Sequence, residues 1–191
     1  AEALCQEIPN AWMPQQFQNP ANPDIHERTT ALEIWEDTGG DIDILVAGIG
    51  TGGTATGCGR ALKRMNPAVQ VIGVEPEGSA VISGNSPGAH RIQGIGAGFV
   101  PTILDTEVLD EVISISDHSA ESTTRALAEG DGLLVGVSAG AAVAAALRVG
   151  QRSENLNKLI VVILPDTAER YLSHPVFGPI SDAAELAVPA D

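Results

Sequence analysis

The sequence predicts an α/β protein with a doubly wound, mostly parallel sheet and helices on both faces. Short apolar runs are continuous instead of alternating with polar residues, which is typical of strands buried on both faces of a parallel sheet. Segments of helical character separate most of these runs. Glycine is frequent, with 21 residues, and aromatic residues make up only 3% of the chain. This composition suits tight turns between strands and helices better than a β-sandwich.

Five apolar runs are the expected strands. In chain order they are residues 42–48, 69–76, 111–116, 132–138 and 158–165. The expected helices are residues 54–65, 117–129 and the Ala-rich segment 139–150. Asp117 or Ser119 would cap the second helix at its N-terminus, ahead of Glu121. The segment 78–100 is glycine-rich and has no clear period, and a loop of that length inside a compact domain is usually functional.

The charge balance argues against several classes of partner. Lys and Arg total 10 against 25 Asp and Glu, which gives a formal net charge of −15. Nucleic acids and anionic membrane surfaces attract clustered Lys and Arg, so we expect neither as a partner. No apolar run reaches the roughly 18 residues of a membrane span.

Cysteine and histidine do not indicate a metal site. Cys5 and Cys58 form neither a disulfide framework nor a metal-ligand pattern, and the 4 histidines show no metal-ligand spacing. We therefore expect no metal, and a reducing, cytoplasmic setting. Cys58 follows the first glycine-rich loop and is expected to pack as a small hydrophobic residue.

A glycine-rich loop at residues 48–57 follows the first expected strand and precedes a helix. Glycine allows a tight turn there and exposes backbone N–H groups to an anion at the helix N-terminus. Gly48, Gly50 and Gly53 match the G-x-G-x-x-G fingerprint of dinucleotide-binding domains. Glu75 ends the next expected strand, where a ribose-binding acid would be. An NAD-binding domain is therefore one hypothesis.

Hydroxyl groups in the same loop favour a different ligand. Thr51, Thr54 and Thr56 flank the glycines. Several hydroxyl donors together with backbone amides suit a terminal phosphomonoester, which has more acceptor oxygens to satisfy than a pyrophosphate. A purely structural tight turn is the third interpretation.

The segment 136–140, GVSAG, matches the G-x-S-x-G nucleophile elbow of α/β-hydrolases. Asp166 and His174 follow Ser138 in the order of a hydrolase triad. They lie close together in the chain, however, whereas the acid and base of hydrolases sit on separate strand ends. Ser138 would point into the crevice at the carboxyl end of a strand, or would cap the Ala-rich helix.

Several motifs together resemble one enzyme family. They are QFQNPANPDIHERTTALEIW at 16–35, GIGTGGT at 48–54, GVEP at 73–76, HRIQGIGAGFVP at 90–101, GVSAGAAVAAAL at 136–147 and ILPDTAERYLS at 163–173. Their order and spacing are similar to those of cysteine synthases, the O-acetylserine sulfhydrylases. These are pyridoxal 5'-phosphate (PLP)-dependent enzymes of the tryptophan synthase β type, with fold type II. The resemblance extends from about Ala1 to Phe177.

The resemblance implies a role for each matching residue. The segment that cradles the PLP phosphate corresponds to Gly50, Thr51, Gly52, Gly53 and Thr54. Ser138 corresponds to the residue that hydrogen-bonds the pyridine nitrogen. Gln16 corresponds to a residue near the amino-acid substrate, and Gly94 to the loop opposite it.

The resemblance also implies the synthesis of cysteine by β-replacement, in which sulfide takes the place of the acetate of O-acetylserine. Members of the family are usually homodimers, and serine acetyltransferase is a candidate partner. The family uses a Schiff-base lysine, but Lys63 and Lys158 lie outside any matching motif. We therefore expect no catalytic residue in this chain, and the Schiff-base lysine upstream of it.

The implied domain organisation is that of the carboxy-terminal part of such an enzyme. Residues 1–14 would be the helical end of a smaller amino-terminal domain, 15–177 the large PLP-phosphate-binding domain, and 178–191 an acidic tail. Such a part, without the lysine, is expected to be inactive by itself.

Three alternatives remain open. A cystathionine β-synthase would use a thiol amino acid in place of sulfide, although QGIGAGFVP at 93–101 favours the acetylserine class. An O-phosphoserine-using sulfhydrylase would place Arg91 near the substrate phosphate. A non-catalytic module that binds phosphorylated ligands would explain the missing lysine.

Overall fold

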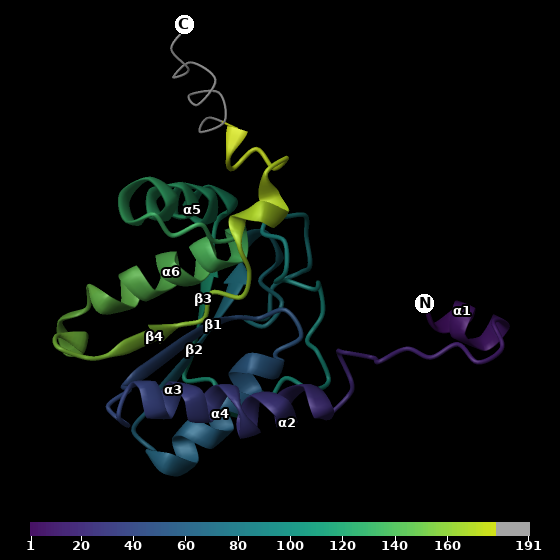
Figure 1. The fold of residues 1–191 in the computed structure, drawn as a ribbon, viewed down its shortest axis with the longest axis horizontal. Coiled ribbons are helices and arrows are strands. Elements are labelled where there is room, and N and C mark those ends of the chain that lie inside the picture. The colour runs from purple at the N-terminus through teal and green to yellow at the C-terminus, as the bar shows by residue number, and fades with distance from the viewer. Residues whose placement is uncertain (179–191) are drawn as a thin grey trace, which may run out of the picture.

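A four-stranded parallel sheet organises the chain. The structure, a computed structural model, describes residues 1–178. The strands are β1 (Ile44–Gly48), β2 (Gln70–Pro76), β3 (Glu111–Ile115) and β4 (Ile160–Val162), in the order β3-β2-β1-β4. Each neighbouring pair is parallel, and helices cover both faces (Figure 1). The predicted doubly wound α/β class is therefore confirmed.

Helices form the outer layers. One face carries α2 (Ala21–Arg28), α3 (Thr30–Asp37) and α4 (Gly53–Met65), and the other carries α5 (Asp117–Asp131) and α6 (Val137–Gly150) (Figure 1). The helices α4 and α5 match the predicted segments 54–65 and 117–129. No prediction covers α2 and α3.

Successive side chains of β1 point to opposite faces, and both faces are covered. Ile44 and Val46 pack in the core on the α6 side. Leu45 packs on the other side with Cys58 and Leu62 of α4. All three strand side chains are 0% exposed. This two-sided burial is the reason that the run is continuously apolar.

The chain connections change direction at β1. The chain leaves β1 through α4 to reach β2 on one side, and β4 later joins the other side of β1 after α5 and α6. Ala47 pairs with Gly73 of β2, and Val46 pairs with Val162 of β4. In open α/β sheets, a crevice forms outside the carboxyl ends of the strands at such a switch point. The fold therefore places a crevice beyond Gly48 and Val162.

The predicted strand 132–138 is wrong. Gly132 ends α5 in the left-handed conformation, with a φ of 69°. The run contributes only an isolated antiparallel bridge between Val135 and Thr167, and it then starts α6. Ser138 is therefore in a helix and not at the end of a strand. A short apolar run does not by itself distinguish a buried strand from the buried turn of a helix.

Two boundaries also differ from the prediction. The run 158–165 is a strand only at Ile160–Val162. The helix α5 is capped by Ser116, whose side chain accepts a hydrogen bond from the N–H of Ser119. Neither Asp117 nor Ser119 is the cap, because both are already helical and a capping residue has extended backbone.

The predicted long loop 78–100 is confirmed. A short 3₁₀ turn at Glu77–Ser79 is the one regular feature that the structure assigns near its start. Gly94 has a φ of 96°, a left-handed conformation that glycine adopts without strain. The N–H of Gly96 donates to the carbonyl of Ile49 at 3.0 Å. The loop therefore passes over the end of β1.

The amino-terminal residues lie apart from the sheet. The helix α1 (Glu2–Glu7) has no buried residue, and Figure 1 shows it apart from the other helices and the strands. The assignment of residues 1–14 to a smaller domain stays a prediction. The predicted acidic tail 178–191 lies outside the described residues, except for Gly178.

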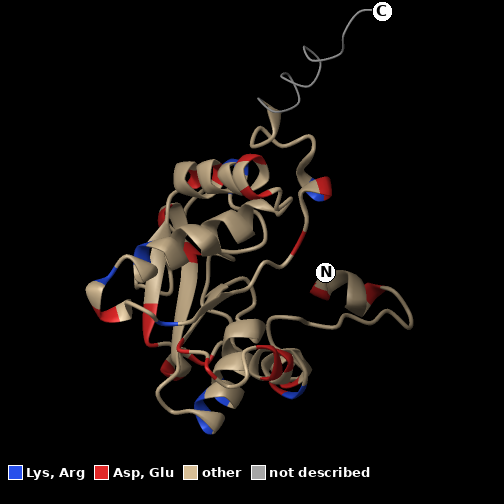
Figure 2. Cartoon of the chain, turned by 60° about the vertical axis from the view of Figure 1, so that its left-hand side comes forward, with Lys and Arg blue, Asp and Glu red and all other residues tan. Residues whose placement is uncertain are grey.

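Acidic side chains are spread over the outer helices α2, α3 and α5 (Figure 2). Several basic side chains pair with acidic ones, as Arg64 does with Glu27 and Arg152 with Glu111. Exposed pairs of this kind contribute little to stability. Within residues 1–178, no helix is long and apolar enough to cross a membrane, and no group of three or more His, Cys, Asp or Glu is placed to hold a metal.

Cys58 should be chemically inert in the folded protein. Its side chain is 0% exposed, and burial, together with nearby Glu33, raises its pKa to about 12. The thiolate is the reactive form of cysteine, so a thiol reagent should modify Cys5 alone in native buffer. Both free cysteines should react after denaturation. Rapid modification of both thiols in the native protein would contradict this packing.

Candidate functional site

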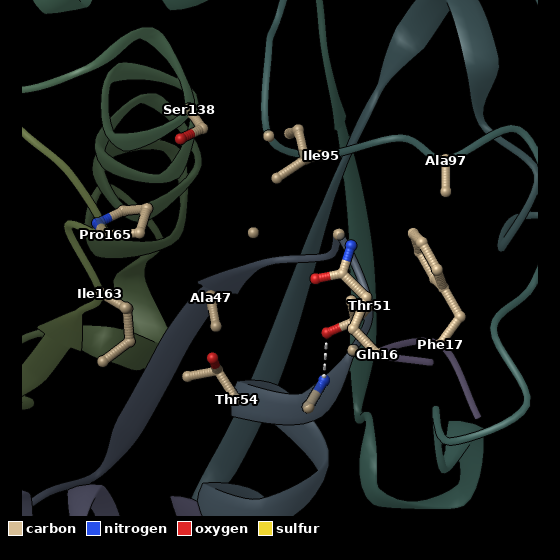
Figure 3. Close-up of a pocket in the computed structure, with 15 residues that line it drawn as sticks. Gln16, Phe17, Ala47, Thr51, Thr54, Ile95, Ala97, Ser138, Ile163 and Pro165 are labelled. Atoms are coloured by element: carbon tan, nitrogen blue, oxygen red, sulfur yellow. Dashed lines mark hydrogen bonds between the residues drawn. The ribbon is translucent and has the colours of Figure 1, made fainter. Parts of the chain in front are cut away.

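A cavity of about 510 Å³ lies at the switch point of the sheet. It is bounded by the end of β1, the start of α4, the first turn of α6 and the segment after β4 (Figure 3). The long loop reaches it through Ile95 and Ala97, and the amino-terminal segment reaches it through Gln16 and Phe17. Segments far apart in the sequence therefore meet at this cavity.

Every site residue that the resemblance assigns lines this cavity. These residues are Gln16, Gly50, Thr51, Gly52, Gly53, Thr54, Gly94 and Ser138. Figure 3 shows Ser138 on α6, whereas Thr54 lies at the start of α4. The structure brings these residues together, and the role of each stays a prediction.

The start of α4 presents backbone N–H groups to the cavity. Gly52 is the N-cap in the left-handed conformation, with a φ of 83°. The N–H of Thr56 makes the first intrahelical bond, to Gly52 O at 2.9 Å. The backbone N–H groups that precede Thr56 in the first turn have no carbonyl acceptor within the helix. The positive end of the helix dipole lies at the same place. An anion is stabilised at such a position.

Thr51 is held in place by α2. Asn22 Nδ2 donates to Thr51 Oγ1 at 3.0 Å and to Gln16 O at 2.9 Å. The N–H of Gly53 donates to the same hydroxyl oxygen at 3.3 Å (dashed line in Figure 3). Because these bonds use the lone pairs of the hydroxyl, its proton remains free for a ligand. A Cβ atom on Gly53 would overlap Asn22 Oδ1, so this contact requires glycine.

His26 supports Thr54 from behind the cavity. Its Nε2 lies 3.3 Å from Thr54 Oγ1, and its Nδ1 lies 2.9 Å from Thr30 Oγ1. Burial lowers the pKa of His26, which favours the neutral ring near neutral pH. Sequence reasoning missed this residue. No helical spacing marks it, because His26 is in α2 and Thr30 begins the next helix, α3.

Ser138 and Gly94 are neighbours in the lining of the cavity. Ser138 is 3% exposed, and a Cβ atom on Gly94 would lie 3.6 Å from Ser138 Oγ. Gly50 contacts the same loop, because a Cβ atom there would overlap Gly94 O. The two glycines therefore keep the space between Ser138 and the start of α4 open.

The wall of the cavity carries no formal charge. Among the described residues that line it there is no Asp, Glu, Lys, Arg or His. Its polar groups are hydroxyls, amides and the end of a helix dipole, which suit the oxygens of a phosphomonoester. An apolar surface from Ala47, Ile95, Ile163 and Pro165 lies beside them. The cavity can therefore hold a phosphate attached to a largely apolar group.

The structure argues against the NAD hypothesis. Glu75 is 1% exposed and does not line the cavity. Its carboxylate accepts hydrogen bonds from the N–H groups of Ile82 at 2.9 Å and Ser83 at 3.1 Å, and from the Ser83 hydroxyl. The acid that would bind a ribose instead anchors the long loop.

The geometry also argues against a hydrolase triad. Asp166 Oδ2 accepts a hydrogen bond from the Tyr171 hydroxyl, and His174 Nδ1 accepts one from the N–H of Val176. Within residues 1–178, no hydrogen bond connects Ser138 to Asp166 or His174. In the part of the chain that the structure describes, Asp166 and His174 are therefore not arranged as the acid and base of Ser138.

Comparison with known proteins agrees with this geometry. Residues 1–166, most of the chain, match the family of pyridoxal-phosphate dependent enzymes. The chain belongs to this family. It is 51% identical over 180 residues to cysteine synthase A of Escherichia coli, a match that covers 90% of this chain and 56% of that protein.

Solved structures of relatives have the same fold as this PLP-family chain. The crystal structure of cysteine synthase from Entamoeba histolytica has a TM-score of 0.89 and 44% identity, and the match covers 92% of this chain and 52% of that one. The O-acetylserine dependent cystathionine β-synthase from Helicobacter pylori has a TM-score of 0.87 and 44% identity, covering 92% of this chain and 57% of that one. The chain thus spans about half the length of the relatives it matches.

The donor set of the cavity fits the phosphate and ring of the family's cofactor, but it includes no lysine. Lys63 Nζ pairs with Asp110 Oδ2 at 2.7 Å near the end of α4. Lys158 precedes β4, at the amino ends of the strands. Neither lines the cavity. These residues can therefore hold PLP by non-covalent contacts only.

Arg91 does not support a phosphoserine substrate. Its Nε lies 2.9 Å from Glu121 Oε1, and the same nitrogen lies 4.0 Å from Asp117 Oδ2. Arg91 does not line the cavity. The guanidinium is therefore already paired on the surface.

Proposed function

We propose that the chain is the cofactor-binding part of a cysteine synthase. This PLP-dependent enzyme would convert O-acetylserine and sulfide into cysteine and acetate. One observation carries the proposal: residues matched separately to the phosphate, the ring and the substrate of the family all line a single cavity at the switch point. The identity of 51% to cysteine synthase A of Escherichia coli supports the choice of reaction.

The start of α4 would bind the cofactor phosphate. Backbone N–H groups after Gly53 and the hydroxyls of Thr51 and Thr54 would donate to its oxygens. Asn22 and His26 keep those two hydroxyls in place. Because no basic side chain lines the cavity in the described chain, the helix dipole would offset much of the phosphate charge.

Ser138 would hold its hydroxyl proton at the pyridine nitrogen. Bound PLP supplies an electron-withdrawing ring that labilises the groups on the α- and β-carbons of an amino acid. A neutral hydroxyl leaves the nitrogen without the full positive charge that an Asp partner would stabilise. Ser138 would thereby moderate the electron withdrawal, which favours β-elimination of a good leaving group over transamination.

Gln16 and Gly94 would lie on the substrate side of the ring. The carbonyl of Gln16 is fixed by Asn22, and the lack of a side chain at Gly94 leaves room in front of Ser138. Phe17 stacks at a tilt on Phe99, with ring centroids 5.1 Å apart, and would help to exclude water from the mouth of the cavity. The similarity to the Helicobacter pylori enzyme keeps a thiol amino acid as the alternative nucleophile.

We propose that the catalytic lysine comes from outside these 191 residues; the absence of both lysines of the chain from the cavity lining supports this. We further propose a homodimer, with serine acetyltransferase as a candidate partner, on the basis of the resemblance. A reducing, cytoplasmic setting is supported by the two free cysteines.

The 191-residue chain alone should bind the cofactor without catalysing the reaction. We expect calorimetry to detect binding of inorganic phosphate and of deoxypyridoxine phosphate, the PLP analogue without the reactive aldehyde. Thr51→Val should weaken both ligands about tenfold, the effect of one lost hydrogen bond to a charged group. The matched change Thr102→Val, at an exposed loop position, should alter neither.

The same chain, given PLP, O-acetylserine and sulfide, should form no cysteine. If the wild-type chain bound neither inorganic phosphate nor deoxypyridoxine phosphate, the cofactor site would be refuted. Cysteine formation would refute the inactivity of the isolated chain.

A further inference from the structure

An acidic side chain lies against the start of α6 without lining the cavity. Asp166 Oδ2 accepts a hydrogen bond of 2.6 Å from the hydroxyl of Tyr171, and Tyr171 is 5% exposed. Asp166 Oδ1 is buried and has no hydrogen-bond partner within residues 1–178. The pair of Asp166 and Tyr171 takes part neither in the proposed phosphate contacts at the start of α4 nor in the proposed reaction.

The carboxylate packs directly on Gly136. A Cβ atom on Gly136 would overlap Asp166 Oδ1 and would lie 2.5 Å from Tyr171 Cε2. The N–H of Gly136 donates to the carbonyl of Asp166 at 3.1 Å. The N–H of Ala168 donates to the carbonyl of Leu134 at 3.1 Å. Backbone and side-chain contacts thus fix the turn before α6 to the segment after β4.

That turn determines where Ser138 lies. Gly136 is the N-cap of α6, and Ser138 is the second residue of the helix. The helix has no side-chain cap and no acidic residue in its first turn, so its positive end lacks the usual local compensation. A carboxylate fixed beside Gly136 supplies a negative charge at this end of the helix.

We propose that Asp166, held by Tyr171, is a positioning residue that fixes the first turn of α6 and so directs the Ser138 hydroxyl into the cavity. The inference rests on the proposed function, because it concerns the partner of the cofactor ring. It adds a residue that acts through Ser138 and touches no ligand itself. Its effect should therefore depend on the presence of the Ser138 hydroxyl.

A double-mutant cycle on the full 191-residue chain tests this dependence. Dissociation constants are measured for deoxypyridoxine phosphate and for inorganic phosphate. We expect Ser138→Ala and Asp166→Ala each to weaken deoxypyridoxine phosphate about tenfold, and the double variant to be no weaker than Ser138→Ala alone. Inorganic phosphate should stay within about twofold throughout, because the start of α4 is unchanged.

Two results would overturn the inference while leaving the proposed function intact. One is a double variant whose loss of affinity for deoxypyridoxine phosphate is the product of the losses of the two single variants. The other is an equal loss of inorganic phosphate binding, which indicates general damage to the fold. If the wild-type chain bound neither ligand, the proposed function would fail first and the inference with it. Asp166→Asn, which keeps the volume of the side chain, repeats the cycle if the alanine variant does not fold.

Tyr171 offers a direct readout of the contact, because it is the only tyrosine of the chain. Burial and the bond to Asp166 raise its pKa to about 12, against a lowering by Arg170. The ring of His174 lies 6.2 Å away, centroid to centroid. Near-ultraviolet titration of tyrosinate should show a lower midpoint in Asp166→Asn, since a negative neighbour is lost. The exposed control Asp131→Asn should keep the wild-type midpoint, and an unchanged midpoint in Asp166→Asn would refute the contact.

Discussion

Replacement of Gly50 by alanine should weaken deoxypyridoxine phosphate about tenfold to hundredfold, which corresponds to about 1.4 to 2.7 kcal/mol. The new Cβ atom would overlap the carbonyl oxygen of Gly94. The carbonyl belongs to the backbone, and the backbone of residue 50 fixes the position of the Cβ atom, so no side-chain rotation can relieve the overlap. Gly50 and Gly94 both line the cavity, so a shift of either segment would change the space for the ring.

Calorimetric titration measures this effect, and Gly130→Ala is the matched control. No atom lies within 4 Å of a Cβ atom at Gly130, which is in α5 and away from the cavity. We expect the control to bind like the wild type. If the dissociation constant of Gly50→Ala were within twofold of the wild-type value, the close contact between Gly50 and the carbonyl of Gly94 would be contradicted.

Replacement of Gly140 by alanine should lower the free energy of unfolding by about 2 to 3 kcal/mol. A Cβ atom there would overlap the Thr124 hydroxyl and lie 2.5 Å from the carbonyl oxygen of Ala120. Thr124 is 0% exposed and donates to that carbonyl at 2.9 Å. The helices α5 and α6 therefore approach too closely at Gly140 to admit a side chain.

Urea unfolding of the full chain measures the loss of stability. The same change at the open position Gly130, also in a helix, should instead stabilise the chain by about 0.5 to 1 kcal/mol, because alanine is the better helix former. Equal midpoints for Gly140→Ala and the wild type would contradict the close approach of the two helices.

The G-x-S-x-G pattern has a packing explanation in this fold. Gly136 lies against Asp166, and Gly140 lies against Ala120 and Thr124. Each glycine is needed because backbone or a fixed side chain occupies the space of its Cβ atom. The nucleophile-elbow pattern thus arises because two glycines, at the start and in the first turn of α6, pack against neighbouring segments. The role proposed for Ser138, which lies between these glycines, needs no general base.

The strands beside the cavity were predictable because both of their faces are buried. The runs 42–48 and 69–76 differ from β1 and β2 only at their first residues. The run 132–138 is also largely apolar, but it forms a loop and the start of α6. Apolar character reports burial, and it does not report which backbone conformation is buried.

The residues proposed to bind a ligand were predictable from their motifs, whereas those that support them were not. Thr51 and Thr54 lie in a glycine-rich turn with a recognisable pattern. Asn22 and His26 contribute only because α2 packs against α4. This packing depends on Gly53 and on tertiary contacts, which no local pattern of the sequence records.

The uncharged wall of the cavity has a consequence for selectivity. A chain with a net charge of −15 repels anions at long range, and no cation at the cavity in the described chain counteracts this repulsion. If the cavity binds a phosphate as proposed, attraction would begin only when its oxygens meet the directed N–H and O–H groups at the start of α4. A cluster of lysines would retain many kinds of anion, whereas this arrangement would retain those whose geometry matches the donors. Discrimination among anions would therefore depend on shape and direction rather than on charge.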